Sequence, residues 1–282
     1  MTAVTSAAGP TAGSASAAAS PVGRTIARAN SDRAGALIGY LPVGFPTLAG
    51  SIDAAVALVE NGVDVLELGL PYTDPVMDGP VIQRATQTAL ENGFRLRDAF
   101  TAVEAIRARV DAPILLMTYY NPIVQYGIDR FADDLVSAGG AGLITPDLTV
   151  DSGAEWLATS DRTGLDRVFL TAPTSTSERL KLAVDHSRGF VYVVSTMGVT
   201  GARGDVDSAA RTLVDRLREV GASTSTASAC VGIGISTGDQ VAEVLAYADG
   251  AIVGSALVRA LSEHGVAGVA RVAAELAAGT RR

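Results

Sequence analysis

The most constraining feature of this sequence is a unit that repeats along the chain from about residue 36. Each unit is a short apolar run that ends in turn residues, followed by a stretch with Ala, Leu, Asp, Glu and Arg at helical spacing. Alternation of this kind predicts parallel strands joined by crossover helices. Eight such units can be counted, and their predicted strands cover residues 36–43, 63–70, 113–120, 141–147, 167–173, 190–196, 229–236 and 250–257.

Eight rounds over about 240 residues favour a closed α/β barrel, a (β/α)8 TIM barrel in a single domain. The pattern alone leaves an open doubly wound sheet as the alternative. The composition is 48% hydrophobic and 18% charged, which suits a large globular core. We therefore predict a catalytic barrel domain over residues 31–282. Residues 1–30, rich in Ala, Ser, Thr and Gly, are predicted to form a disordered tail.

Charge and cysteine content exclude several classes of protein. The net charge is −8 and the basic residues are scattered, so no nucleic-acid partner is expected. Cys230 is the single cysteine, which excludes a disulfide framework and favours the cytoplasm. The first thirty residues lack the basic start and apolar segment of a signal peptide, and no window reaches about 18 consecutive apolar residues. A soluble protein without a membrane partner is expected.

A carboxylate lies within the second predicted strand, VDVLELGL (63–70). Because strand side chains alternate between faces, Val65 and Glu67 share one face and Leu66 and Leu68 share the other. The leucines suit the helix layer, which leaves Glu67 pointing into the barrel near the carboxyl end, where such barrels place their catalytic groups. Burial would raise its pKa and let it act as acid and base. The alternative is a structural carboxylate paired with a neighbouring hydroxyl or amide.

Two aspartates follow in PYTDPVMDGPVIQRA (71–85), where Asp, Pro and Gly mark a loop before a helix. Asp74 and Asp78 could simply cap a turn or that helix. A loop after a barrel strand could also bring Asp78 over the pocket that holds Glu67. Two carboxylates could then divide one reaction between them, and spacing alone leaves both interpretations open.

Glycine-rich segments follow the last three predicted strands: GVTGARG (198–204), GIGIS (232–236) and VGSAL (253–257). Backbone amides are exposed where strand gives way to helix, and barrels often bind phosphate in this quarter. One such cluster would only permit a turn, but three on the same side of the barrel predict a phosphate site.

The positions of lysine and histidine narrow the chemistry further. Lys181, the single lysine, lies in a helical pattern, which argues against a Schiff-base aldolase. His186 and His264 also fall in helical stretches, so no histidine metal site is expected. Serine-nucleophile and dinucleotide motifs are missing. Carboxylate acid–base chemistry on a phosphorylated substrate remains.

The motifs LELGLPYTDPVMDGPVIQ, MTYYNPI, MGVTG, VGIGIS and AIVGSAL together resemble the tryptophan synthase alpha family, from about residue 36 to 275. The resemblance implies retro-aldol cleavage of indole-3-glycerol phosphate to indole and glyceraldehyde 3-phosphate, without a cofactor. Glu67 matches the family's catalytic glutamate in LELG, and Asp78 matches its aspartate in the DGP segment. Glu67 would give and take protons, while Asp78 would bind the indole N–H and stabilise the charge on the ring.

The resemblance also assigns binding residues. The residues expected to contact or approach the phosphate are Gly201, Gly234, Ser236, Gly254 and Ser255. Those expected to line the indole pocket are Tyr40, Leu116, Tyr119 and Tyr192, although Tyr119 and Tyr192 could also be ordinary barrel core. Thr200 resembles a residue of the loop that closes over the pocket, and Asp147 resembles its hinge partner. Thr196 and Met197 depart from the family's pattern, which leaves the details of loop closure open.

Family members work with a beta subunit that uses pyridoxal phosphate and receives indole, so an alpha2beta2 heterotetramer is implied. Segments 71–75 and 120–127 are the expected contact surface. Three alternatives remain: an isomerase of the same pathway, a stand-alone lyase that releases free indole, and a weakly active binding or regulatory subunit. The intact carboxylates argue against the first and third, whereas the second shares every residue named here.

Overall fold

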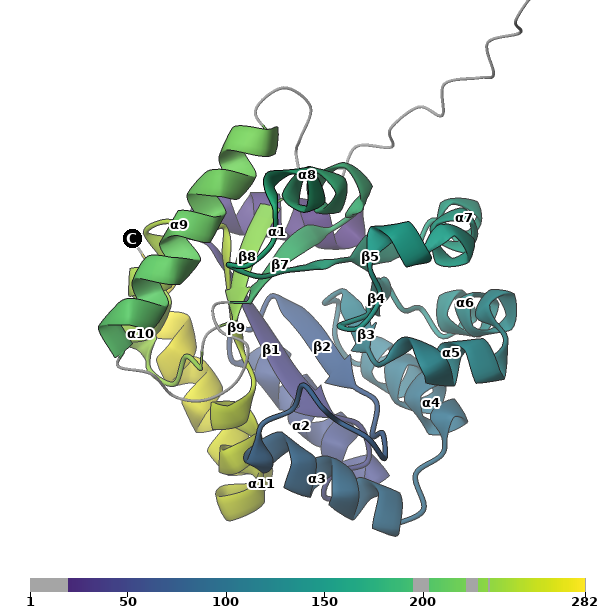
Figure 1. Ribbon diagram of the computed structural model, residues 1–282. Helices are drawn as coiled ribbons and strands as arrows, with labels where there is room; N and C mark the ends of the chain where they lie inside the picture. The colour runs from purple at the N-terminus through teal and green to yellow at the C-terminus, as the bar shows by residue number, and fades with distance from the viewer. Residues whose placement is uncertain (1–19, 195–202, 222–227, 233, 282) are drawn as a thin grey trace, which may run out of the picture.

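Parallel strands run through the middle of the molecule and helices surround them (Figure 1). The computed structural model describes residues 20–194, 203–221, 228–232 and 234–281. Within these residues the strands are β1 (Ala36–Pro42), β2 (Val65–Gly69), β3 (Ile114–Met117), β4 (Gly142–Ile144), β5 (Asp166–Val168), β6 (Leu170–Thr171), β7 (Phe190–Val194), β8 (Ser228–Gly232) and β9 (Gly250–Val253).

The strand order β5-β4-β3-β2-β1-β9-β8-β7-β6 confirms a barrel. β5 and β6 belong to one predicted strand, interrupted at Phe169. Its first half pairs with β4 and its second half pairs with β7, both in parallel, so the two edges of the sheet meet there. The eight predicted strands are therefore present, and the open sheet is excluded.

Helices follow the strands around the barrel, and most of them bury one apolar face against it. The helices are α1 (Pro21–Asp32), α2 (Leu48–Glu60), α3 (Pro80–Glu91), α4 (Leu96–Arg107), α5 (Tyr120–Tyr126), α6 (Ile128–Ser137), η2 (Val150–Ser152), α7 (Ala154–Thr163), α8 (Ser177–His186), α9 (Arg203–Gly221), α10 (Gly238–Leu245) and α11 (Ser255–Ala278).

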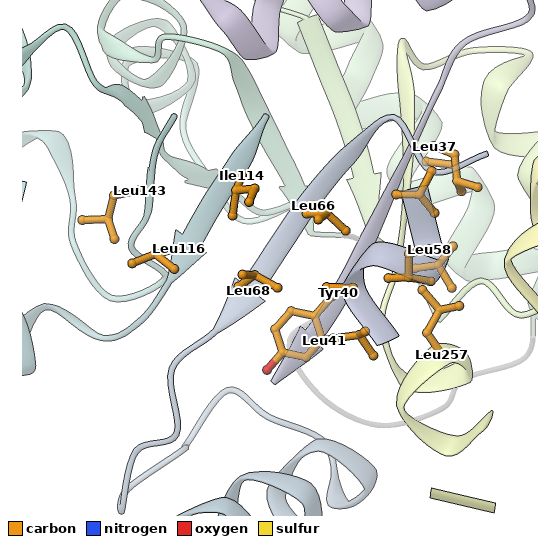
Figure 2. Packing of buried hydrophobic residues seen from close by; sticks show 14 of the residues in the cluster. Leu37, Tyr40, Leu41, Leu58, Leu66, Leu68, Ile114, Leu116, Leu143 and Leu257 are labelled. Atoms are coloured by element: carbon orange, nitrogen blue, oxygen red, sulfur yellow. The ribbon is translucent and has the colours of Figure 1, made fainter. Parts of the chain in front are cut away.

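Strand alternation sorts the buried side chains into two clusters. Ile38, Val65 and Leu115 belong to a cluster inside the barrel. Leu66 and Leu116 belong to the larger cluster, which lies mainly between strands and helices and also includes Tyr40; Figure 2 shows it at close range. The register pairs Ile38 with Val65 and Leu66 with Ile114, so neighbouring strands present the same face together.

The predicted tail is wrong over its last third, because residues 21–32 form α1. Ser20 caps this helix by accepting from the Gly23 N–H at 2.8 Å. Val22 and Ile26 are buried in the inner cluster. They lie where the strands begin, so α1 closes the amino end of the barrel. The Ala- and Ser-rich composition hid this short apolar face; residues 1–19 lie outside the described part.

Candidate active site

Glu67 lies in the middle of β2, on the same face as Val65 of the inner cluster. The predicted inward orientation is confirmed, because Leu66 and Leu68 occupy the opposite face. Its side chain is 0% exposed, and neither carboxyl oxygen has a hydrogen-bond partner among the residues that the structure describes. Burial raises its pKa to about 8. The alternative of a structurally paired carboxylate therefore has no support here, and Glu67 is largely protonated at neutral pH.

Two tyrosines inside the barrel lie near Glu67. Tyr40 on β1 pairs with Glu67 in the strand register. The Tyr40 hydroxyl lies so close to Gly69 that a Cβ added there would clash with it, so the close contact of Tyr40 with β2 requires a glycine at this position. Tyr192 lies on β7. Burial raises the pKa of both phenols, and the negative charges of Glu67 and Asp78 raise them further. Both carboxyl groups therefore influence the pKa values of the same two phenols, which lie within the barrel.

Asp78 lies in the loop between β2 and α3, and its backbone N–H donates to the Pro75 carbonyl at 3.1 Å. It does not cap α3, because Gly79 is the N-cap residue and makes no side-chain cap bond. Partial burial raises the pKa of Asp78 to about 6. At neutral pH Asp78 is thus mainly ionised while Glu67 is mainly protonated, the difference that acid–base division of labour requires.

Asp74, the other aspartate of this loop, bonds to its near neighbours in the chain. Its carboxylate accepts from the Thr73 hydroxyl at 2.7 Å, and its carbonyl accepts from the Val76 N–H at 2.9 Å. Both contacts are typical of a surface turn. The interpretation as a side-chain cap of a turn therefore applies to Asp74.

Tyr119 fixes the position of the loop that carries Asp78. Its hydroxyl accepts from the Met77 N–H at 2.8 Å, one residue before Asp78. The Tyr119 ring is buried and lies 5.2 Å from the ring of Tyr72, between ring centres. The negative charge of Asp78 raises the pKa of the Tyr119 phenol, after the larger effect of burial. Tyr119 therefore lies beside the candidate site and also holds its loop.

The placement of Leu116 contradicts its expected role in the pocket. Leu116 pairs with Leu68 and with Leu143 in the cluster that faces the helices (Figure 2). Met117 pairs with Gly69, and the alternation therefore places its side chain on the face of Glu67. Met117 therefore lies where Leu116 was expected, and its apolar character alone does not indicate this position.

Asp147 lies after β4 and binds the start of α5. Its two carboxylate oxygens accept from the Tyr120 N–H at 2.9 and 3.1 Å. Negative charge is favourable at a helix N-terminus. Thr200, Gly201, Thr196 and Met197 lie outside the described residues, so the partnership of Asp147 with Thr200 stays a prediction.

The loops after β8 and β9 lie side by side, because these strands pair. Gly234 has a φ of +68°, and a Cβ added there would meet nothing within 4 Å. Gly254 and Ser255 begin α11, and no side chain of the described residues caps that helix. The first amides of a helix attract anions, so this corner offers donors for a phosphate.

Ser236 is placed differently from the other predicted phosphate residues. Its N–H and its hydroxyl both donate to the Gln240 side-chain oxygen, at 2.8 and 3.0 Å. Gln240 is a further residue of this corner, and its spacing from Thr237 is that of a capping box, the one signal of it in the sequence.

The residues of the excluded chemistries lie away from this site. Lys181 on α8 pairs with Asp185 at 2.7 Å, and His264 lies within α11. Within the described residues, no three His, Cys, Asp or Glu side chains are arranged to hold a metal ion. None of the helices that the structure describes is long and apolar enough to cross a membrane.

Comparison with known proteins gives a consistent result. The family model described as "Tryptophan synthase alpha chain" matches residues 26–280. A tryptophan synthase alpha chain of Leifsonia xyli is 70% identical over 263 residues, 93% of this chain and 99% of the relative. The solved structure of Mycobacterium tuberculosis tryptophan synthase in space group F222 has a TM-score of 0.87 at 50% identity, covering 93% of this chain and 99% of that chain. The alpha subunit from Legionella pneumophila has a TM-score of 0.84 at 29% identity, covering 93% and 98%.

Proposed function

This chain belongs to the tryptophan synthase alpha chain family, and from that premise we propose that Glu67 and Asp78 carry out its reaction. The reaction is the retro-aldol cleavage of indole-3-glycerol phosphate to indole and glyceraldehyde 3-phosphate, a lyase step of L-tryptophan biosynthesis. The observation that carries the proposal is the carboxyl group of Glu67, which is fully buried, turned into the barrel and without a hydrogen-bond partner in the described part of the chain.

Glu67 is the general acid and then the general base. Its proton goes to indole C3, which gives an indoleninium-like intermediate. The resulting carboxylate then takes the proton from the hydroxyl of the substrate's glycerol phosphate side chain. The bond between indole C3 and this side chain breaks, and the electron pair of the bond returns to the indole ring. A pKa of about 8 supports this role, because the group is protonated at neutral pH and still close enough to neutrality to exchange its proton.

Asp78 accepts a hydrogen bond from the indole N–H and stabilises the positive charge that develops on the ring. Its pKa of about 6 supports this role, because it is ionised while Glu67 is protonated. The Tyr119 hydroxyl, through Met77, keeps the loop of Asp78 in place.

The remaining roles are binding and closure. Tyr40, Tyr119, Tyr192 and, in place of Leu116, Met117 line the pocket for the flat indole ring. Gly201, Gly234, Gly254 and Ser255 hold the phosphate, with Ser236 close by. Thr200 belongs to a loop that closes over the substrate, with Asp147 as its hinge partner. The catalytic domain extends from α1 to the end of α11, since α1 closes the barrel floor.

The partner is a tryptophan synthase beta subunit, which receives the indole; pyridoxal phosphate belongs to that subunit, and the alpha chain needs no cofactor. We place the contact on segments 71–75 and 120–127. Exposed apolar side chains within and directly after these segments support this surface: Val124 is 47% exposed, and Val76 and Met77, which follow residue 75, are 84% and 41% exposed. The expected assembly is an alpha2beta2 heterotetramer in the cytoplasm.

Release of indole from indole-3-glycerol phosphate by the purified chain tests the proposal. We expect turnover by the chain alone and a higher turnover when a beta subunit is added. Equal rates with and without the beta subunit would favour a stand-alone lyase. No indole release under either condition would refute the lyase assignment and favour a regulatory barrel.

A further inference from the structure

The loop after β8 is held at its far end by one side chain of α10. The Gln240 oxygen accepts from the Ser236 N–H at 2.8 Å and from the Ser236 hydroxyl at 3.0 Å. We propose that Gln240 is a positioning residue that fixes this loop in the conformation that binds phosphate. Ser236 is then the residue through which Gln240 holds the loop, and not a phosphate ligand. The inference rests on the proposed phosphate site and identifies how that site is held.

The hydrogen-bonding capacity of Ser236 supports this division of roles. A serine has one backbone N–H and one hydroxyl proton to donate. Both go to the same amide oxygen, whose two lone pairs can accept both. Ser236 therefore has no donor left for a phosphate unless Gln240 moves away, and moving it would leave the Gln240 oxygen to find two new partners.

The residues before Ser236 show which part of the loop the Ser236–Gln240 bonds hold in place. Ile235 is buried in the hydrophobic core, so the loop is fixed by a side chain at 235 and by two hydrogen bonds at 236. Gly234, directly before them, lies in a left-handed conformation with open space around its Cα. Donors that are already fixed bind an anion better than donors that must be ordered on binding, because no ordering entropy is lost.

An ordinary helix cap is the competing explanation. Thr237 is the N-cap residue of α10, and its hydroxyl accepts from the Gln240 N–H at 3.3 Å. The Gln240 side chain reaches one residue beyond this cap, to Ser236. Both contacts stabilise the helix start. Thr237→Ala removes the cap but leaves the Ser236–Gln240 bonds, and so provides a matched control.

The experiment measures binding of glycerol 3-phosphate to the full chain by calorimetry, together with kcat and KM for indole-3-glycerol phosphate. Gln240→Met keeps the shape of the side chain and removes the strong acceptor. We expect it to raise Kd and KM about fivefold, the effect of losing roughly one net hydrogen bond, with kcat within about twofold of wild type.

The matched variants separate the explanations. Ser236→Ala should raise Kd by less than about twofold, because the bond from its N–H to Gln240 remains. Thr237→Ala should lower the melting temperature about as much as Gln240→Met, with Kd within about twofold of wild type. Gln240→Asn, one methylene shorter, should repeat the result of Gln240→Met and guards against a folding defect of that variant.

Two results would overturn the inference. If Ser236→Ala weakened binding more than Gln240→Met, Ser236 would be a direct ligand. If Thr237→Ala weakened binding as much as Gln240→Met, Gln240 would be only a cap. A failure of the proposed phosphate site is distinguishable from both, because the wild-type chain itself would then fail to bind glycerol 3-phosphate.

Discussion

Within the described residues, Asp166 and Glu67 are both fully buried carboxyl groups inside the barrel, and their surroundings differ. Asp166 begins β5 at the floor, and Glu67 lies on β2 below the open mouth. Equal burial therefore does not make the two groups equivalent. What separates them is the set of groups that each carboxyl contacts.

Asp166 is tied into the structure. One of its oxygens accepts from the Val22 N–H at 3.4 Å, and the Ser20 hydroxyl also bonds to the carboxylate. The other oxygen lies 3.7 Å from Arg188 Nε. Burial raises its pKa to about 6, and the hydroxyl and the Arg188 charge oppose that rise. Asp166 therefore joins α1 to the barrel floor.

Glu67 has no such partners among the residues whose positions are described, and burial raises its pKa to about 8. An unpaired buried carboxyl group lowers stability, and such a cost persists where the group has a function. The comparison teaches that a buried acid becomes a candidate catalyst when the fold leaves it without partners.

The largest effect is expected for Glu67→Gln. Turnover should fall between about 10²- and 10⁴-fold, because the amide can neither give nor take the proton. Steady-state indole release measures this loss. Near wild-type turnover would show that Glu67 is not the acid and base.

The same variant should be at least as stable as wild type. A pKa raised from 4.5 to about 8 contributes stability that is complete below pH 4.5 and is lost as the pH rises through about 8. Glutamine does not titrate, so the melting temperature of Glu67→Gln relative to wild type should increase from pH 5 to pH 9. A constant difference would contradict the raised pKa.

Asp78→Asn should lower turnover about a hundredfold, because the developing charge on the ring loses its counter-charge. The pKa of Asp78 is raised to about 6, so wild-type kcat/KM should fall as the pH drops below about 6. The residual activity of the variant should lack this acid limb. A pH–rate profile with the limb unchanged would assign it to another group.

Asp166→Ala should lower stability and leave turnover nearly unchanged, the reverse of what is expected for Glu67→Gln. We expect kcat within about twofold of wild type and a loss of at least about 2 kcal/mol in the free energy of unfolding, because the Arg188 charge loses a buried partner. Asp53→Ala is the control, since its exposed pair with Arg109 should cost less than about 1 kcal/mol. Equal losses in the two variants would remove the distinction drawn for Asp166.

The smallest effect is expected for Tyr119→Phe. The Met77 N–H loses its acceptor, so the loop of Asp78 is held less firmly and kcat should fall about threefold to tenfold. In an Asp78→Asn background the same substitution should add little, because the two residues act through one contact. Full additivity would show that Tyr119 acts independently of Asp78.

The sequence predicts the barrel well because hydrophobic periodicity follows directly from strand and helix geometry. It also predicts the orientation of Glu67, because a carboxylate among leucines reveals which face of β2 is turned inward. On β3 the same reasoning fails: Leu115 and Leu116 are both apolar, so composition cannot distinguish the inner face from the outer one. The register with β2 decides that question, and it depends on tertiary pairing.

The sequence does not reveal α1 or the structural role of Asp166, for a related reason. The apolar face of α1 has few residues and becomes evident only against the barrel floor that buries it. Asp166 gains its partners from Val22 and Arg188, which are distant in sequence. Contacts between such distant segments leave no periodic pattern in the sequence.

The central claim is that Glu67 is a protonated acid at neutral pH, and an infrared titration of its carboxyl group tests it most directly. The difference spectrum between wild type and Glu67→Gln isolates the carbonyl band of this one acid. We predict that the band is present at pH 7 and disappears as the pH rises through about 8. A band that has already disappeared near pH 4.3, the ordinary value for glutamate, would contradict the account.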